Sequence, residues 1–186
     1  MSTTESAARE LEHGRAAPEQ SRLPSHSTQL PSESDVWHVL AGIPDPEIPA
    51  VSVVDLGVIG AVEVAPGRIR VELLPTFVGC PAIELMRGEI AERLGALAGY
   101  VEVELSFAEP WTTARITPEG RRKLRDSGLA PPAAASVNLV PLAPAAPCPY
   151  CDSRRTVLEN AFGPTLCRAI YYCTDCRQPF EQFKAV

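Results

Sequence analysis

The sequence predicts an α+β protein, in which a small sheet domain of element order αββαβα precedes a C-terminal zinc ribbon. Three observations favour this fold. Helical and strand-like hydrophobic patterns alternate between residues 32 and 128. An uncharged segment rich in Pro and Ala follows at residues 129–147 and indicates a linker. Two Cys-x-x-Cys pairs then fall within residues 148–186, in a pattern typical of zinc ribbons.

The N-terminal segment, residues 1–31, has no aromatic residue and consists mostly of Ser, Thr, Ala, Pro and charged residues. Because it offers little apolar surface to offset the entropy cost of ordering, we predict a disordered tail. The folded domain should begin near Ser32. Ser32 or Ser34 can cap a short helix over residues 35–41, which Gly42 ends.

The next elements are two strands and a helix. Residues 58–64 and 69–73 alternate between apolar and polar side chains, and Pro66-Gly67 predicts a hairpin turn between them. After the break at Gly79-Cys80-Pro81, apolar residues recur at spacings of three and four, which predicts an amphipathic helix that Gly99 closes. The apolar positions of this helix are Ile83, Met86, Ile90, Leu94 and Leu97.

Two more elements complete the first domain. Residues 101–107 alternate and predict a half-buried strand. Thr117-Pro118 then opens a helix, with Pro at its favoured first position, and Gly128 ends it. We expect the helices to cover one face of the sheet. The predicted domain therefore spans residues 32–128.

The composition excludes several classes of protein. The formal net charge is −6, whereas binding to nucleic acid or to an anionic membrane needs a basic surface. No apolar run approaches the roughly 20 residues of a membrane span. The N-terminus lacks the basic and apolar regions of a secretory signal. We therefore expect a cytoplasmic protein that binds neither membranes nor nucleic acid.

The four ribbon cysteines, Cys148, Cys151, Cys173 and Cys176, can present thiolates tetrahedrally to Zn²⁺. The 21 residues between the two pairs accommodate a hairpin. The alternatives are two disulfides or a thioredoxin-like pair. A cytoplasmic location disfavours disulfides, and no βαβ pattern surrounds either pair. The ribbon is nearly neutral, which favours a protein-docking module over DNA binding.

Two further cysteines lie outside this quartet. Cys167, in the ribbon, is interpreted as a small buried apolar side chain, with a fifth metal ligand or a redox group as the alternative. Cys80 stands alone in the first domain, and Pro81 looks like the first helical residue. Cys80 should then lie near the N-cap, where free N–H groups and the helix dipole favour a thiolate.

A thiolate in that position suits a nucleophile, a redox centre or a soft-metal ligand, whereas a buried structural cysteine is the alternative. Nucleophilic catalysis needs a base. Among the three histidines, His13 and His26 lie in the predicted tail and His38 lies mid-helix. The hypothesis of an enzyme that uses Cys80 for redox or acyl-transfer chemistry is therefore weaker than that of a non-catalytic protein.

An ordered set of short motifs resembles a known family. With this set, the chain over about residues 32–186 resembles the PaaD (or PaaJ) family, a component of the phenylacetyl-CoA epoxidase (ring monooxygenase) system. Its first domain is similar to the SufT-type family linked to iron–sulfur protein maturation. The motifs are Asp45-Pro-Glu-Ile-Pro49, Ser52-Val-Val-Asp-Leu-Gly57, Thr76-Phe-Val-Gly-Cys-Pro81, Pro110-Trp-Thr-Thr113, Thr117-Pro-Glu-Gly-Arg-Arg-Lys-Leu124, Gln178-Pro-Phe180 and Phe183-Lys184.

The resemblance implies an accessory role in aerobic phenylacetate catabolism: the assembly or insertion of an iron–sulfur or iron centre in a partner subunit. The implied partners are the oxygenase and reductase subunits or iron–sulfur assembly proteins, and a homo-oligomer is left open. The implied cofactors are zinc and a transient iron or iron–sulfur cluster.

Carried onto this chain, the family's characteristic cysteine is Cys80 and its acidic loop supplies Asp45 and Glu47, for which plain turn chemistry is the alternative. One departure from the family pattern stands out. Ala114-Arg115 occupies a place where an acidic residue and an aromatic residue are expected.

Overall fold

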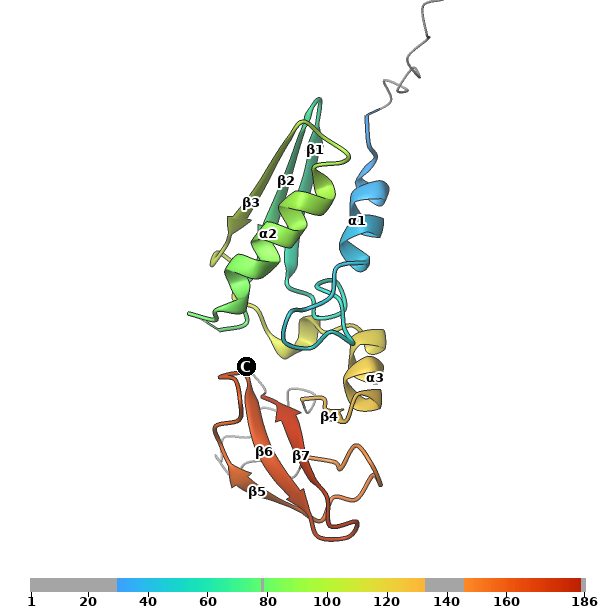
Figure 1. Cartoon of the computed structure of the whole chain (residues 1–186), viewed down its shortest axis with the longest axis vertical. Helices are drawn as coiled ribbons and strands as arrows, with labels where there is room; N and C mark the ends of the chain where they lie inside the picture. Colours follow the sequence, from blue (N-terminus) through green and yellow to red (C-terminus); the bar gives the residue numbers. More distant parts are fainter. Residues whose placement is uncertain (1–29, 78, 133–145, 185–186) are drawn as a thin grey trace, which may run out of the picture.

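The structure, a computed structural model, describes residues 30–77, 79–132 and 146–184 (Figure 1). The predicted tail, apart from its last two residues, lies outside the described residues. So does most of the predicted linker, including a possible edge strand over residues 137–140. Within the described ranges, none of the helices combines the length and the apolarity that crossing a membrane requires.

The predicted α+β class and the element order αββαβα are confirmed. The first domain adds only a short 3-10 turn, Thr113–Arg115, to the predicted elements. These elements are α1 (Glu33–Ala41), β1 (Ile59–Ala65), β2 (Arg68–Leu73), α2 (Ala82–Leu94), β3 (Tyr100–Leu105) and α3 (Pro118–Asp126).

The first sheet has the strand order β1-β2-β3. Strands β1 and β2 form the predicted antiparallel hairpin, and Gly67 at its turn has a φ of +72°, which favours glycine. Strands β2 and β3 run parallel, so the connection between them must cross over through α2. Figure 1 shows α2 lying across one face of this sheet, with α1 beside it. The N-terminal end of α2 therefore lies at the end of the sheet nearest the ribbon.

The predicted amphipathic helix is shorter than its hydrophobic pattern. It ends at Leu94, with Gly95 as the C-cap, whereas the spacing predicted that it would continue past Leu97. Gly95 is a poor helix former, and its N–H closes the last turn on the carbonyl oxygen of Ala91 at 3.0 Å. Leu97 still packs on the core from the following turn.

A buried carboxylate ties the loop before β1 to α3. Asp55 Oδ2 accepts hydrogen bonds from the backbone N–H and the hydroxyl of Ser52, both at 2.9 Å. It also accepts one from Lys123 Nζ at 2.7 Å. Burial alone would raise the pKa of Asp55, but the hydrogen bonds from Lys123 and Ser52 outweigh it and hold the pKa below its ordinary value. Much of the Ser52–Gly57 motif is therefore structural.

The segment 111–115 closes over the same loop. Trp111 is buried, and its Nε1 donates to the carbonyl oxygen of Leu56 at 2.9 Å. Arg115, at the departure from the expected family pattern, donates to the carbonyl oxygens of Gly57 at 3.0 Å and Ile59 at 3.2 Å. The guanidinium thus satisfies backbone acceptors at the start of β1, so this departure has a structural function.

The second sheet has the order β4-β7-β6-β5. Its first strand lies within the predicted linker: β4 follows α3 directly and pairs in parallel with β7. Gly128, with a φ of +83°, turns the chain from the helix into this strand. The bounds are β4 (Leu129–Ala130), β5 (Thr156–Asn160), β6 (Arg168–Cys173) and β7 (Pro179–Phe183).

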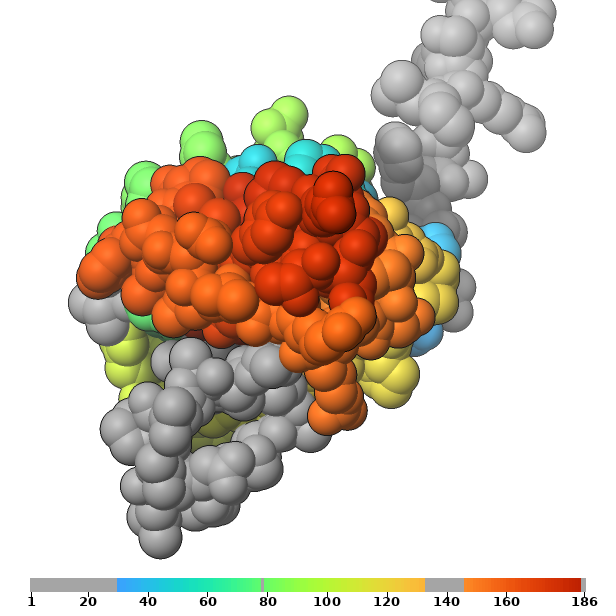
Figure 2. Space-filling view, turned by 90° about the horizontal axis from the view of Figure 1, so that it is seen from below, coloured from blue at the N-terminus to red at the C-terminus, as the bar shows by residue number. Residues whose placement is uncertain are grey.

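The two sheets share part of one hydrophobic core. Phe183 and Cys167 of the ribbon are buried in the cluster that fills the first domain. The Phe183 ring lies 5.8 Å, between centroids, from the ring of Trp111. Seen from below, the ribbon covers the end of the first domain (Figure 2). The ribbon is therefore packed onto the first domain.

Two helical glycines give a matched test of the contact between α3 and the loop before β1. A Cβ at Gly120 would lie 2.4 Å from the carbonyl oxygen of Asp55, whereas a Cβ at Gly88, on the exposed side of α2, would meet nothing within 4 Å. Gly120→Ala should therefore lower the free energy of unfolding by about 1–3 kcal/mol. Gly88→Ala should raise it by roughly 0.5–1 kcal/mol. Urea denaturation measures both, and equal stability of the two variants would contradict the packing.

Candidate metal centre and interdomain pocket

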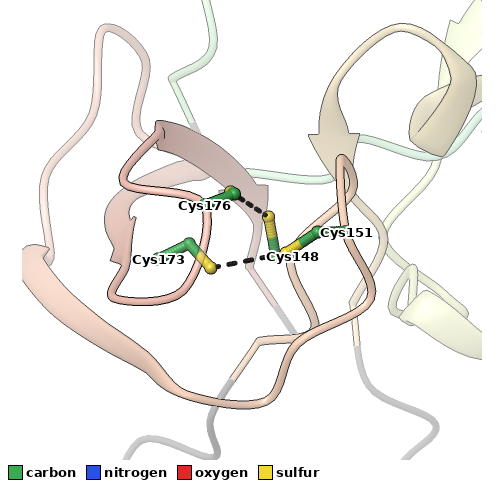
Figure 3. Close-up of side chains that lie close together, drawn as sticks. All are labelled: Cys148, Cys151, Cys173 and Cys176. Atoms are coloured by element: carbon green, nitrogen blue, oxygen red, sulfur yellow. Dashed lines mark hydrogen bonds between the residues drawn. The ribbon is translucent and has the colours of Figure 1, made fainter.

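The four predicted ribbon cysteines come together at one end of the second sheet. Cys148 and Cys151 lie in the segment before β5, and Cys173 and Cys176 lie at the turn between β6 and β7 (Figure 3). The Sγ atoms of Cys148 and Cys176 are 3.6 Å apart, as are those of Cys151 and Cys173. All four Sγ atoms lie within 4.8 Å of one another.

The two Cys-x-x-Cys turns have the same backbone geometry. The N–H of Asp152 donates to the carbonyl oxygen of Cys148, and that of Arg177 to the carbonyl oxygen of Cys173, both at 2.9 Å. Asp152 and Arg177 each follow the second cysteine of a pair, and their φ values are 62° and 60°. Two equivalent turns that face each other place their sulfur atoms around one point, which is how zinc knuckles present a metal site.

The spacing of the sulfur atoms fits a metal ion and not disulfides. A disulfide holds its sulfur atoms about 2.05 Å apart. Four thiolates at about 2.3 Å from a tetrahedral Zn²⁺ lie about 3.8 Å from one another. The observed 3.6 Å is close to the second value, and all four cysteines are free. The quartet can therefore bind a metal ion.

The backbone prepares this quartet for deprotonation unevenly. N–H groups of Cys176 and Asp175 lower the pKa of Cys173 to about 7. Desolvation, reinforced by the neighbouring thiols, raises the pKa of Cys176 to about 12. Because four thiolates repel one another, a cation must compensate for their full ionisation, and metal binding should release protons.

Cys80 lies one residue before the N-cap of α2. The helix begins at Ala82 and Pro81 is its N-cap, so Pro81 is not the first helical residue as predicted. Burial raises the pKa of the Cys80 thiol. The backbone N–H groups of Ala82 and Ile83 oppose this effect, and the carboxylates of Glu47 and Asp45 add to it. The prediction that the helix start would favour the thiolate is therefore wrong, because burial and nearby negative charge outweigh it.

The acidic loop combines turn chemistry with proximity to Cys80. Asp45 Oδ1 accepts the backbone N–H groups of Glu47 at 2.9 Å and Ile48 at 2.8 Å, which is an Asx-type turn. Burial raises the pKa of Asp45 despite these bonds and the charge of Arg168. Glu47 is half-buried and directs its carboxylate toward the ribbon, where Cys167 Sγ donates to Oε2 at 3.8 Å.

The structure brings Cys167 to the same place, which sequence reasoning did not foresee. It is buried, as predicted, but its neighbours include Glu47 and, electrostatically, Cys80 of the first domain. Thr165 Oγ1 lies 3.0 Å from its Sγ. A pocket of about 240 Å³ lies between Glu47, the segment around Cys80 and the ribbon turn at residues 163–167. No motif signals this pocket, because it exists only where the ribbon docks.

The comparisons with known proteins match both parts of the chain. The description "PaaD zinc beta ribbon domain" matches residues 132–184, and "Iron-sulfur cluster assembly protein" matches residues 33–105. A protein of Escherichia coli, named as a candidate fourth component (component D) of 1,2-phenylacetyl-CoA epoxidase, is 40% identical over 158 residues. The match covers 84% of this chain and 94% of that protein.

This chain belongs to the PaaD family. The first domain of this PaaD-family chain is also 32% identical over 98 residues to an Fe-S protein maturation auxiliary factor of Porphyromonas gingivalis, covering 51% of the chain and 92% of that protein. Among solved structures, a domain of unknown function from Bacillus anthracis covers 50% of the chain and 90% of its own length, at 22% identity and a TM-score of 0.47. A conserved hypothetical protein of Thermotoga maritima covers 50% of the chain and 93% of its own length, at 30% identity and a TM-score of 0.43.

Proposed function

We propose that this PaaD-family protein is a non-catalytic accessory factor of the phenylacetyl-CoA epoxidase system in aerobic phenylacetate catabolism. It assembles or inserts an iron–sulfur cluster, or iron, in a partner subunit of that system. The partner is an oxygenase or reductase subunit or an iron–sulfur assembly protein. The match of the first domain to iron–sulfur assembly proteins and the overall match to an epoxidase component of Escherichia coli support this role.

The observation that carries the proposal is the half-buried Cys80 thiol beside two carboxylates at the edge of a pocket. A thiolate is the ligand that iron–sulfur clusters use, and carboxylates also bind iron. In this proposal Cys80 and Glu47 hold the cargo, and Asp45 shapes the loop that presents Glu47. A site with few protein ligands leaves coordination positions on the metal for a recipient protein, so the cargo can leave.

The ribbon quartet has a different role in this proposal. Four thiolates complete a tetrahedral Zn²⁺ site and leave no open position for exchange, which is the character of a structural site. A ribbon of this size cannot bury a large core by itself, so the metal supplies folding free energy. Zinc therefore holds the ribbon, and the cargo binds elsewhere.

The competing hypothesis, a Cys80-dependent redox or acyl-transfer enzyme, has less support. A nucleophilic thiol needs a lowered pKa or an adjacent base. The pKa of Cys80 is raised, and besides burial the groups that act on it are carboxylates and backbone N–H groups. In the described part of the chain, the one histidine is His38, on α1.

Anaerobic purification with zinc, iron and sulfide analysis tests the division of roles. The intact protein should contain about one zinc per chain together with iron. Cys80→Ser should lose iron and keep its zinc, because a hydroxyl is a poorer soft-metal ligand than a thiolate. Glu89→Gln, an exposed change on the same helix, serves as the control and should keep both metals. Unchanged iron in Cys80→Ser would rule out Cys80 as the cargo ligand.

A further inference from the structure

We propose that the iron cargo site spans both domains and that Cys167 of the ribbon is its second thiolate ligand, with Glu47 between the two cysteines. The ligand would be Fe²⁺ or a small iron–sulfur cluster. This inference rests on the function proposed above, and it assigns a role to a cysteine that the ribbon quartet does not use.

The cavities between the domains place these groups together. Cys80, Cys167 and Glu47 all line the pocket of about 240 Å³. The same three residues, with Asp45, also line an adjoining cavity of about 20 Å³. A space of roughly 10–15 Å³ is enough for one water molecule, so the smaller cavity can admit a single ion and the larger one a small cluster. Two thiols and two carboxylates around one small cavity form a donor set for iron.

Hydrogen bonds hold the Cys167 sulfur in place at this cavity. Its Sγ donates to Glu47 Oε2 at 3.8 Å and lies 3.0 Å from Thr165 Oγ1. Its backbone is also fixed, because its carbonyl oxygen accepts the N–H of Lys184 at 2.8 Å. The sulfur and the carboxylate oxygen are therefore already neighbours across the domain boundary, and a metal that replaces the thiol proton would bridge them.

The docking of the ribbon keeps this arrangement rigid. Arg168, the next residue, donates through Nη2 to the carbonyl oxygen of Glu47 at 2.6 Å and through Nη1 to Glu181 at 2.8 Å. Phe183 packs against Trp111 on the same side of the ribbon. The metal-stabilised ribbon would therefore position one half of the cargo site.

The charges favour a cation at this place. Burial raises the pKa of Cys167, and Glu47 and Cys80 add to this effect while Thr165 and Arg168 oppose it. Both thiols should thus stay protonated until a metal ion arrives and displaces the protons. The ribbon quartet is the only group of three or more such residues, within the described ranges, whose ligand atoms all lie within 4.8 Å. The interdomain set is more open, which suits a cargo that must be released.

The test loads the full-length protein anaerobically, first with Fe²⁺ alone and then with Fe²⁺ and sulfide. Thiolate-to-iron absorption and X-ray absorption at the iron edge report how many sulfur atoms bind the metal. Cys167→Ser should weaken Fe²⁺ binding to an extent similar to Cys80→Ser and remove one thiolate from the iron, while zinc content stays unchanged. Glu47→Gln should also weaken binding, and Glu89→Gln should not.

The outcomes separate this inference from the function on which it rests. If Cys80→Ser loses iron while Cys167→Ser keeps it with an unchanged sulfur shell, the two-domain site is wrong and the proposed function stands. If the intact protein binds iron with neither probe, both fall. If Cys167→Ser does not fold, the intact protein decides. With Fe²⁺ alone, two cysteine sulfur atoms on the iron support the inference, and a single one contradicts it.

Discussion

Cells whose only copy of this protein carries Cys80→Ser should fail to grow on phenylacetate although the oxygenase subunits are present. In the proposed function the thiolate holds the iron or the cluster before transfer, and a hydroxyl binds these soft centres poorly. The reductase of the epoxidase system should then accumulate with under-filled iron–sulfur sites. Iron and sulfide per reductase, measured on reductase purified anaerobically from these cells, check the expectation.

The control for this experiment separates chemistry from folding. If the thiol only packed, Cys80→Ala would cost modest stability and leave epoxidation in cells unchanged. Growth on a carbon source that does not need the epoxidase, and the amount of folded protein, should match between Cys80→Ser and wild-type cells. Full growth on phenylacetate with fully occupied clusters in the Cys80→Ser strain would contradict the proposal.

Cys173→Ala should remove the zinc and unfold the ribbon. With one thiolate missing, the site no longer closes around the metal, and the folding free energy that the metal supplies is lost. Hydrogen exchange should show loss of protection over residues 148–184. The first domain should stay folded but become less stable, because Phe183 and Cys167 leave its core. A buried Phe alone contributes about 3–5 kcal/mol when it is truncated to Ala.

The neighbouring exposed residue supplies a matched control for the ribbon. Thr174→Ala removes one exposed hydrogen bond, from Thr174 Oγ1 to the carbonyl oxygen of Arg155 at 2.9 Å, and should keep zinc and hydrogen-exchange protection. A red shift of tryptophan fluorescence in Cys173→Ala alone would report exposure of Trp111 as Phe183 withdraws. If protection over residues 148–184 is the same in Cys173→Ala and Thr174→Ala, the metal does not hold the ribbon.

Periodicity was sufficient to predict the order of elements in the first domain, because each helix and strand buries one face and its apolar residues repeat at the corresponding period. Element ends were less predictable. The helix α2 stops at Leu94 because Gly95 turns the chain, although Leu97 continues the apolar pattern. Leu129 and Ala130 carry no strand signal within a Pro- and Ala-rich segment, and they form β4 because β7 offers an unpaired edge.

The sequence by itself determined the α+β class and the four cysteines that meet in the ribbon, since local periodicity and the Cys-x-x-Cys turn are short-range properties of the chain. Tertiary structure decided the surroundings of Cys80, where burial and two carboxylates raise the pKa that the helix start would lower. It also decided the position of Cys167, which lies 120 residues from Glu47 in the chain and 3.8 Å from its carboxylate in space. Such a contact depends on how one domain docks on the other, and that docking follows from the shapes of two apolar surfaces, which no local pattern encodes.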